Sequence, residues 1–211
     1  MSRGYPLALV LVALALAGCS SGGDSGKPAA SAGPSGTARA SGSGSPTPTA
    51  TSTAVPLPGS CQSLLPLIDL DEALGVPMVG QTNYIKGVAE PKIKRTGRVT
   101  CRYGIVKVGH NLKPPKLEVG VSTYTDDAAA TQRVETTVTG LRSEGATPTD
   151  VQVNGVPAKV LSTSAGGATL VVATGSRTVV MTLAEKVIKP ADTVKVLTAI
   201  GTIALKNLPT E

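Results

Sequence analysis

The chain has 211 residues, a formal net charge of +6 and aromatic side chains at only 2% of positions, with Trp and Phe absent. This modest positive charge falls short of the basic footprint of a nucleic-acid-binding protein, so we expect no nucleic-acid partner. A core must therefore be built from Val, Leu, Ile and Ala, with few of the large rings that usually anchor ligand pockets.

The first eighteen residues have the pattern of an export signal. Arg3 is the lone early charge, and an unbroken apolar run follows from Leu7 to Ala17. This pattern predicts a signal peptide over residues 1–18. The apolar run is much shorter than the ~20 residues that a helix needs to cross a bilayer, which argues against a permanent membrane span.

Residues 16–19, Leu-Ala-Gly-Cys, resemble the lipobox of bacterial lipoproteins. The resemblance implies that the thiol of Cys19 receives a diacylglyceryl group and becomes the mature N-terminus. Two acyl chains hold a protein stably on a membrane, whereas one chain binds only marginally. We therefore expect a lipid anchor at the extracytoplasmic face of the cell membrane. The alternative is an ordinary cleaved signal followed by an incidental cysteine.

Residues 19–58 are almost entirely Ser, Gly, Ala, Pro and Thr, with Asp24, Lys27 and Arg39 as the only charges. Such a composition cannot form a core and predicts a disordered linker. A flexible tether of this length has a root-mean-square span of roughly 30–40 Å. The composition changes near Cys61, and residues 59–211 are the right size for a single folded domain.

Lipidation of Cys19 leaves Cys61 and Cys101 as an even pair of thiols in an exported protein. The sequence therefore predicts a disulfide between them. Closing a loop of about 40 residues would contribute on the order of 3–4 kcal/mol to stability. A metal site is the competing use, but two thiols without nearby histidines fall short of the ligand set of structural zinc. We expect neither a metal nor a cofactor.

The apolar spacing within the domain alternates between helical and strand periods. Asp69 and Glu72 predict a capping box at the start of a short helix that ends at Gly75. Alternation over 117–123 predicts a half-buried strand. Asp126 and Asp127 then favour the start of a helix that runs to Gly145. Its apolar stripe is Ala130, Val134, Val138 and Leu141.

Two hairpins and a final helix follow. Asn154-Gly155 is the strongest short hairpin signal, and alternating apolar residues flank it. The apolar runs 169–173 and 178–183 flank Gly175-Ser176 and predict central strands that are covered on both faces. Pro190 and Asp192 begin the last helix, whose apolar face is Val194, Leu197, Gly201, Ala204 and Leu208, widened by Ile200 and Ile203. This order predicts an α+β domain with an antiparallel sheet and helices packed on its faces.

The cysteines also carry a family resemblance. Cys61-Gln-Ser-Leu-Leu65, then Leu74-Gly75, then Cys101-Arg-Tyr103 resemble the opening of a family of actinobacterial cell-surface lipoproteins of unknown function. In that family the aromatic residue is usually Trp, so Tyr103 is a departure. Related mycobacterial lipoproteins imply a fold similar to PsbP. The family brings no established activity.

Candidate catalytic groups are few. His110 is the one histidine and lies in the polar stretch Gly109-His110-Asn111, which is typical of a loop. We find no spacing that indicates a nucleophile with a base beside it. The acidic clusters, Asp69, Asp71 and Glu72 and then Asp126 and Asp127, stand where helix starts favour negative charge. We therefore expect no catalytic residue and no enzyme activity.

One region is strongly basic. Between residues 86 and 116, nine Lys and Arg side chains stand against Glu90 alone: Lys86, Lys92, Lys94, Arg95, Arg98, Arg102, Lys107, Lys113 and Lys116. One hypothesis is an anion-binding patch, formed by Lys92, Lys94, Arg95, Arg98 and Arg102, that contacts anionic lipid or phosphate-bearing wall polymer. The alternative is a solvated loop and strand edge, where lysines discourage aggregation.

These observations predict a membrane-anchored extracytoplasmic lipoprotein whose domain is a non-enzymatic binding or interaction module of the cell envelope. Its expected partners are the membrane, through the lipid anchor, and an envelope protein, lipid or anionic polymer. The first alternative is a carrier of lipid or a small ligand, with an apolar cavity between sheet and helices. An envelope hydrolase is a more distant alternative.

Overall fold

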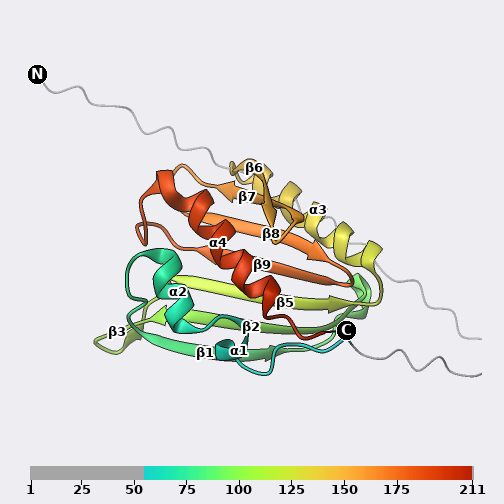
Figure 1. The fold of residues 1–211 in the computed structure, drawn as a ribbon, viewed down its shortest axis with the longest axis horizontal. Coiled ribbons are helices and arrows are strands. Elements are labelled where there is room, and N and C mark those ends of the chain that lie inside the picture. The colour runs from blue at the N-terminus through green and yellow to red at the C-terminus, as the bar shows by residue number, and fades with distance from the viewer. Residues whose placement is uncertain (1–54, 211) are drawn as a thin grey trace, which may run out of the picture. The chain divides into compact units, whose positions relative to one another are not determined.

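A computed structural model describes residues 55–210 of the chain. The predicted signal peptide, the lipid site at Cys19 and the predicted linker as far as residue 54 lie outside the described residues. Within 55–210, a seven-stranded antiparallel sheet carries helices on both faces, which confirms the predicted α+β fold class (Figure 1). No helix in this part of the chain has both the length and the apolar character needed to cross a membrane.

The sheet has the strand order β1-β2-β5-β9-β8-β7-β6, and β3 and β4 form a separate small hairpin. The predicted succession of a helix, several strands, a helix, two hairpins and a helix is confirmed. The elements in chain order are α1 (Cys61–Leu64), α2 (Leu67–Leu74), β1 (Gln81–Gly87), η1 (Pro91–Ile93), β2 (Arg95–Ile105), β3 (Lys107–Val108), β4 (Asn111–Leu112), β5 (Leu117–Tyr124), α3 (Asp127–Ser143), β6 (Thr147–Val153), β7 (Val156–Ser162), β8 (Ala168–Thr174), β9 (Arg177–Leu183), η2 (Pro190–Asp192) and α4 (Thr193–Lys206).

Both predicted hairpins are confirmed. Asn154 and Gly155 join β6 to β7 with φ values of 51° and 79°, and Gly175 begins the turn from β8 to β9 with a φ of 53°. Turns with positive φ at their central residues match the right-handed twist of the strands that they connect. Strands β8 and β9 lie inside the sheet between β5 and β7, with buried side chains on both faces as predicted.

Helix α3 covers one face of this half of the sheet. Asp126 is its N-cap, as predicted, and the side chain accepts a hydrogen bond of 2.7 Å from the Ala129 N–H. Val138 on the predicted apolar stripe packs against Leu161 and Val171 from the sheet. Val134 and Leu141 of the stripe pack against the same cluster, which forms a second core on the side of the sheet opposite α4. Ala130 is buried in a separate small cluster with Tyr124.

Helix α4 lies on the other face (Figure 1). Residues 190–192 form a 3-10 turn, so the α-helix itself begins at Thr193. Gly201 faces the sheet so closely that a Cβ there would lie 3.0 Å from Val153 Cγ1. Because Gly201 has no side chain, α4 packs closely against the sheet over the main core.

The predicted capping box at Asp69 and Glu72 is wrong. Helix α2 begins earlier, at Leu67, with Pro66 in the N-cap position and Asp69 inside the first turn. Proline has no N–H and a fixed φ, so the helix can start directly after it without a side-chain cap. The helix ends at Gly75 as predicted, because that residue takes the left-handed conformation with a φ of 69°.

Candidate functional site: an apolar groove and a basic cleft

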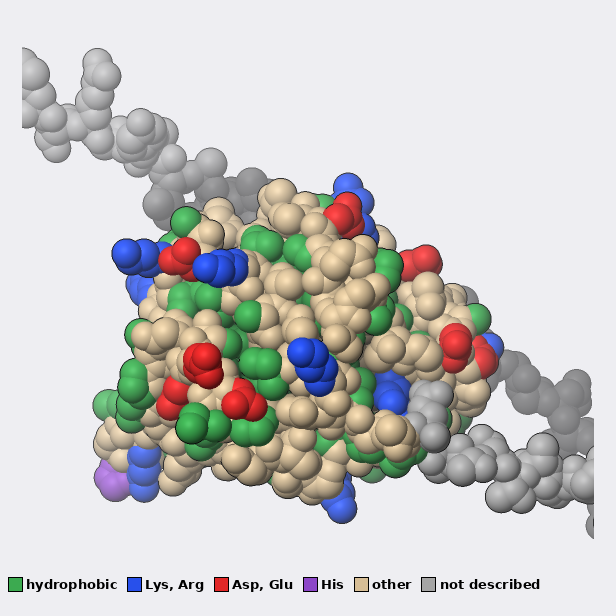
Figure 2. All heavy atoms as spheres, in the orientation of Figure 1, with side chains coloured by type: hydrophobic (Ala, Val, Ile, Leu, Met, Phe, Trp, Pro, Cys, Tyr) green, Lys and Arg blue, Asp and Glu red, His purple; other side chains and the backbone are tan. Residues whose placement is uncertain are grey.

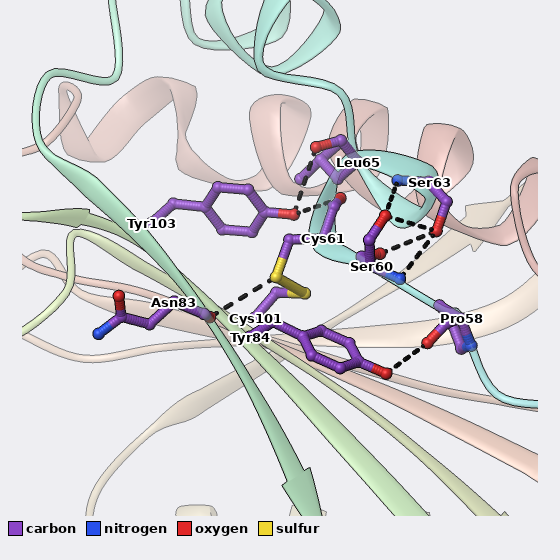
Figure 3. The surroundings of a disulfide bond; sticks show 9 residues. All are labelled: Pro58, Ser60, Cys61, Ser63, Leu65, Asn83, Tyr84, Cys101 and Tyr103. Atoms are coloured by element: carbon purple, nitrogen blue, oxygen red, sulfur yellow. Dashed lines mark hydrogen bonds between the residues drawn. A yellow bond between two sulfur atoms is a disulfide. The ribbon is translucent and has the colours of Figure 1, made fainter.

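The domain is fastened at its start by the predicted disulfide, which is present between Cys61 and Cys101 (Figure 3). The bond joins α1 to β2, with the two Cα atoms 5.5 Å apart. Ser60 and Ser63 form a capping box that holds the single turn of α1 in place. The segment that follows the predicted linker is thereby fixed on the face of the sheet that α4 covers.

Two tyrosines hold the same region. The buried Tyr103 hydroxyl lies 3.0 Å from the Cys61 backbone oxygen and 3.2 Å from that of Leu65 (Figure 3). Burial raises the pKa of Tyr103 above its ordinary value, so this side chain stays a neutral hydrogen-bond donor. The Tyr84 hydroxyl donates a hydrogen bond of 2.7 Å to the Pro58 oxygen. Ordered structure therefore begins before Cys61.

A hollow in the described domain lies between α2, α4 and the segment that connects β9 to α4. It has a volume of about 740 Å³ and adjoins a second hollow of about 360 Å³, with which it shares Leu74, Val76, Lys186 and Val187. We call the two together the groove. Cavities of this size are typical of small-molecule sites. In Figure 2, apolar side chains gather over α2, α4 and the connection from β9.

Small and apolar residues make the groove. Ala73 on α2 and Ala199 on α4 both line it, and their short side chains leave the space between the two helices open. Val187 and Ile188 add an apolar wall from the connecting segment. Val76 is 45% exposed at the junction of the two hollows. An apolar surface that stays open to solvent within a concave site is a feature of ligand-binding grooves.

Charged side chains line the rim of the groove. Across its two hollows there are four cations, Lys116, Lys186, Lys189 and Lys195, and three carboxylates, Glu72, Glu185 and Asp192. None of the ion pairs found among residues 55–210 involves these groups. Lys186 has a φ of 62°, one of three positive values at residues other than glycine between positions 55 and 210. Such a conformation is strained for a side chain with a Cβ, and strained residues of this kind cluster at functional sites.

The predicted anion-binding patch is divided by the fold. Arg95 pairs with Glu90 and Arg102 pairs with Glu118, both at 2.7 Å. Arg98 lies between them on β2, and its Nε donates a hydrogen bond to the Thr100 hydroxyl. Lys94 also contacts a carboxylate, that of Asp126, at 3.6 Å. Since carboxylates pair with three of the five predicted cations, these five residues do not form one continuous surface of unpaired charge.

Lys92 and Lys94 come together at a cleft of about 220 Å³ between η1 and α3. The opposite wall, from α3, contributes Gln132, Arg133 and Thr136. We call this site the basic cleft. Of its three cations, Lys94 alone has an ion pair within residues 55–210, a contact of 3.6 Å with Asp126. The structure thus adds Arg133 to two of the predicted cations.

Of the other candidate groups, Glu72 lines the groove and Asp126 contacts Lys94 of the basic cleft, whereas His110 stands apart from both sites. His110 lies in the exposed turn between β3 and β4, which confirms its position in a loop. Asp71 accepts a hydrogen bond of 2.7 Å from the Met78 N–H and fixes the chain beyond α2. Across the described residues, no group of three His, Cys, Asp or Glu side chains is arranged to hold a metal ion.

Sequence reasoning missed the groove and Arg133. The run Lys186-Val-Ile-Lys189 was a usable signal, because two branched apolar residues stand between lysines in a segment outside the predicted elements. Ala73 and Ala199 carry no such signal, since alanine is common in every helix. A comparison with protein-family models found no matching model, and a comparison with curated proteins found no similar sequence.

Proposed function

We propose that this chain is an extracytoplasmic lipoprotein, anchored in the membrane through Cys19, and that its domain is a non-enzymatic binding module of the cell envelope. The proposed ligand is an amphipathic envelope molecule, with an acyl chain in the groove and an acidic group near its lysines. The groove between α2 and α4 carries this proposal.

The chemistry of the groove favours this class of ligand. Ala73, Val76, Val187 and Ile188 offer apolar surface, and burying an acyl chain against such surface contributes about 0.8 kcal/mol per methylene. The rim lysines, of which Lys186 is held in a left-handed conformation, would attract a carboxylate or phosphate at the end of the chain. An oxidising compartment outside the cell suits the Cys61–Cys101 disulfide.

A dansyl-labelled fatty acid tests the groove directly. We expect saturable fluorescence enhancement with the chain from residue 20 onward, and loss of most binding in Ala73→Phe and Ala199→Phe, because each ring would fill the space between the helices. Ala128→Phe is the matched control, since Ala128 is exposed on α3, away from the groove. Equal binding by all four proteins would refute the groove as the site.

A carrier and a binding module differ in whether the ligand stays bound during purification. Mass spectrometry of organic extracts of the purified protein would detect a co-purified lipid if the domain is a carrier. A binding module that engages its ligand reversibly yields none. The anchor is tested separately: the mature N-terminus should be a diacylated cysteine, and Cys19→Ala should abolish that modification. A mature N-terminus elsewhere would refute the lipoprotein assignment.

A further inference from the structure

The basic cleft has two cations without a described carboxylate partner. Lys92 and Arg133 take part in none of the ion pairs found within residues 55–210. Asp126, which lies near Lys94, already accepts hydrogen bonds from the Ala129 N–H at 2.7 Å and the Thr125 hydroxyl at 2.9 Å. Its longer contact of 3.6 Å with Lys94 therefore leaves the ammonium group able to meet a second anion.

Backbone hydrogen bonds hold Lys94 in position where it lines the cleft. Its φ of 57° is left-handed, its N–H donates to the Pro91 oxygen and its oxygen accepts from the Thr125 N–H, each at 3.0 Å. These bonds connect η1 to the segment that begins α3. The cleft is therefore preformed, with Lys92 and Lys94 on one wall and Arg133 on the other.

The described chain enters at the same end of the sheet. Leu57 packs beside Gly97, where a Cβ would lie 2.9 Å from Leu57 Cδ1. Gly97 is on β2, three residues after Lys94, which is the C-cap of η1. Figure 1 shows the described chain beginning beside the C-terminus, with α2 at the other end of the sheet. As a flexible tether, the linker that the sequence predicts between Cys19 and Val55 would span roughly 30–36 Å.

The groove lies at the opposite end of β2. Gly104 on that strand is so close to Met78, which lines the groove, that a Cβ would lie 2.6 Å from the Met78 sulfur. Gly97 and Gly104 are about 23 Å apart at the usual rise of a strand. The basic cleft and the groove are therefore at different ends of the domain.

The end that holds the basic cleft has further features of a membrane-facing surface. Lys86 and Arg98 line a small hollow beside Leu57. Val88 follows β1 and is 79% exposed. Among the carboxylates near this end, Glu90 is paired with Arg95 and Asp126 caps α3, while Asp127 is exposed in the first turn of that helix. Cations with an exposed apolar side chain suit the interface of an anionic membrane.

We infer that the domain docks on anionic phospholipid headgroups through its basic cleft, with a headgroup phosphate between Lys92, Lys94 and Arg133, and that docking leaves the groove facing away from the membrane. The inference rests on the proposed lipid anchor, because the tether keeps the domain within reach of the bilayer. Each cation near an anionic surface strengthens binding modestly, so several act together and salt weakens them.

Vesicle co-sedimentation tests the inference with the unlipidated chain from residue 20 onward, which retains every described residue. We expect retention on vesicles of phosphatidylglycerol and phosphatidylcholine in equal parts, little on pure phosphatidylcholine, and loss of retention between about 0.05 M and 0.5 M salt. Lys92→Gln with Arg133→Gln should lower the partition coefficient on the order of 10-fold or more. Lys94 is left unchanged, so the backbone that shapes the cleft is preserved.

The matched control is Lys107→Gln with Lys113→Gln, which removes the same charge from exposed positions near β3 and β4. Its partition coefficient should change less than about threefold if location matters more than net charge. Equal losses in both double variants, or equal retention on anionic and neutral vesicles, would overturn the inference. So would binding to polyphosphate beads without vesicle retention, which would favour a wall polymer. Fatty-acid binding in the same samples reports on the groove independently.

Discussion

The hydroxyl of Tyr103 lies 3.0 Å from the backbone oxygen of Cys61, whose side chain forms a disulfide with Cys101 two residues before Tyr103. The same short stretch of β2 therefore holds α1 twice, once by a covalent bond and once by a buried hydrogen bond. Cys61, Leu64 and Leu65 are all buried in the main core. The start of the domain is thus joined to the sheet by bonding as well as by packing.

Removing the Tyr103 hydroxyl should destabilise the domain. In Tyr103→Phe, the backbone oxygens of Cys61 and Leu65 lose their buried donor, which costs about 1–2 kcal/mol in the free energy of unfolding, measured with urea. Tyr84→Phe is the control, because the bond from Tyr84 to Pro58 is only partly buried and should cost less. A Tyr103→Phe variant as stable as the wild type would contradict this account.

Reducing the disulfide should have a larger effect. The bond closes a loop with a sequence separation of 40, and the chain-entropy model assigns about 3–4 kcal/mol to such a loop. The variant with both Cys61→Ala and Cys101→Ala should unfold at a correspondingly lower urea concentration, and dithiothreitol should no longer affect it. If dithiothreitol leaves the urea midpoint of the wild type unchanged, the disulfide does not contribute to stability.

Stability should fall in acid, partly through Asp126. Hydrogen bonds from the Ala129 N–H and the Thr125 hydroxyl lower the pKa of this carboxyl in the folded domain. Its contribution is present above the unfolded pKa of about 3.9 and is lost as the pH falls through the lower folded value. Asp126→Asn keeps a capping oxygen without the charge, so its melting temperature should fall less between about pH 6 and pH 3.

Asp192 provides a control for the Asp126→Asn experiment. It precedes α4 in the N-cap position, but its side chain makes no capping hydrogen bond. Asp192→Asn removes the same charge at a helix start without removing a capping hydrogen bond, so it is the charge-matched control for Asp126→Asn. Identical melting curves for the wild type and Asp126→Asn across this pH range would show that the Asp126 carboxylate contributes nothing.

Local signals explain which elements the sequence predicts. The turn at Asn154-Gly155, the cap at Asp126 and the left-handed Gly75 each specify a boundary through a few neighbouring residues. Strand β1 has no such signal, because it is an edge strand whose side chains are almost all exposed. At the start of α2 a local signal is misleading. Asp69 and Glu72 resemble a capping box, yet the helix begins earlier, directly after Pro66.

The sites depend on tertiary structure and are harder to predict. The basic residues between 86 and 116 are neighbours in sequence, but β2 runs about 33 Å from one end to the other and separates them. Lys92 and Lys94 stay at one end, whereas Lys107 follows the other end of β2. Arg133 joins the basic cleft from a helix far along the chain. The groove forms only because α2 and α4, from opposite ends of the domain sequence, lie side by side.

Two helical glycines should respond oppositely to substitution. Gly140 lies within α3 with open space where a Cβ would stand, so Gly140→Ala should stabilise the domain by up to about 1 kcal/mol through helix propensity. A Cβ on Gly201 would lie 3.0 Å from Val153 and 3.4 Å from Leu170. Gly201→Leu should therefore push α4 off the sheet and cost about 1–3 kcal/mol in urea unfolding. Because both sites are helical, a stable Gly201→Leu variant would show that α4 does not pack against β6 and β8 at this distance.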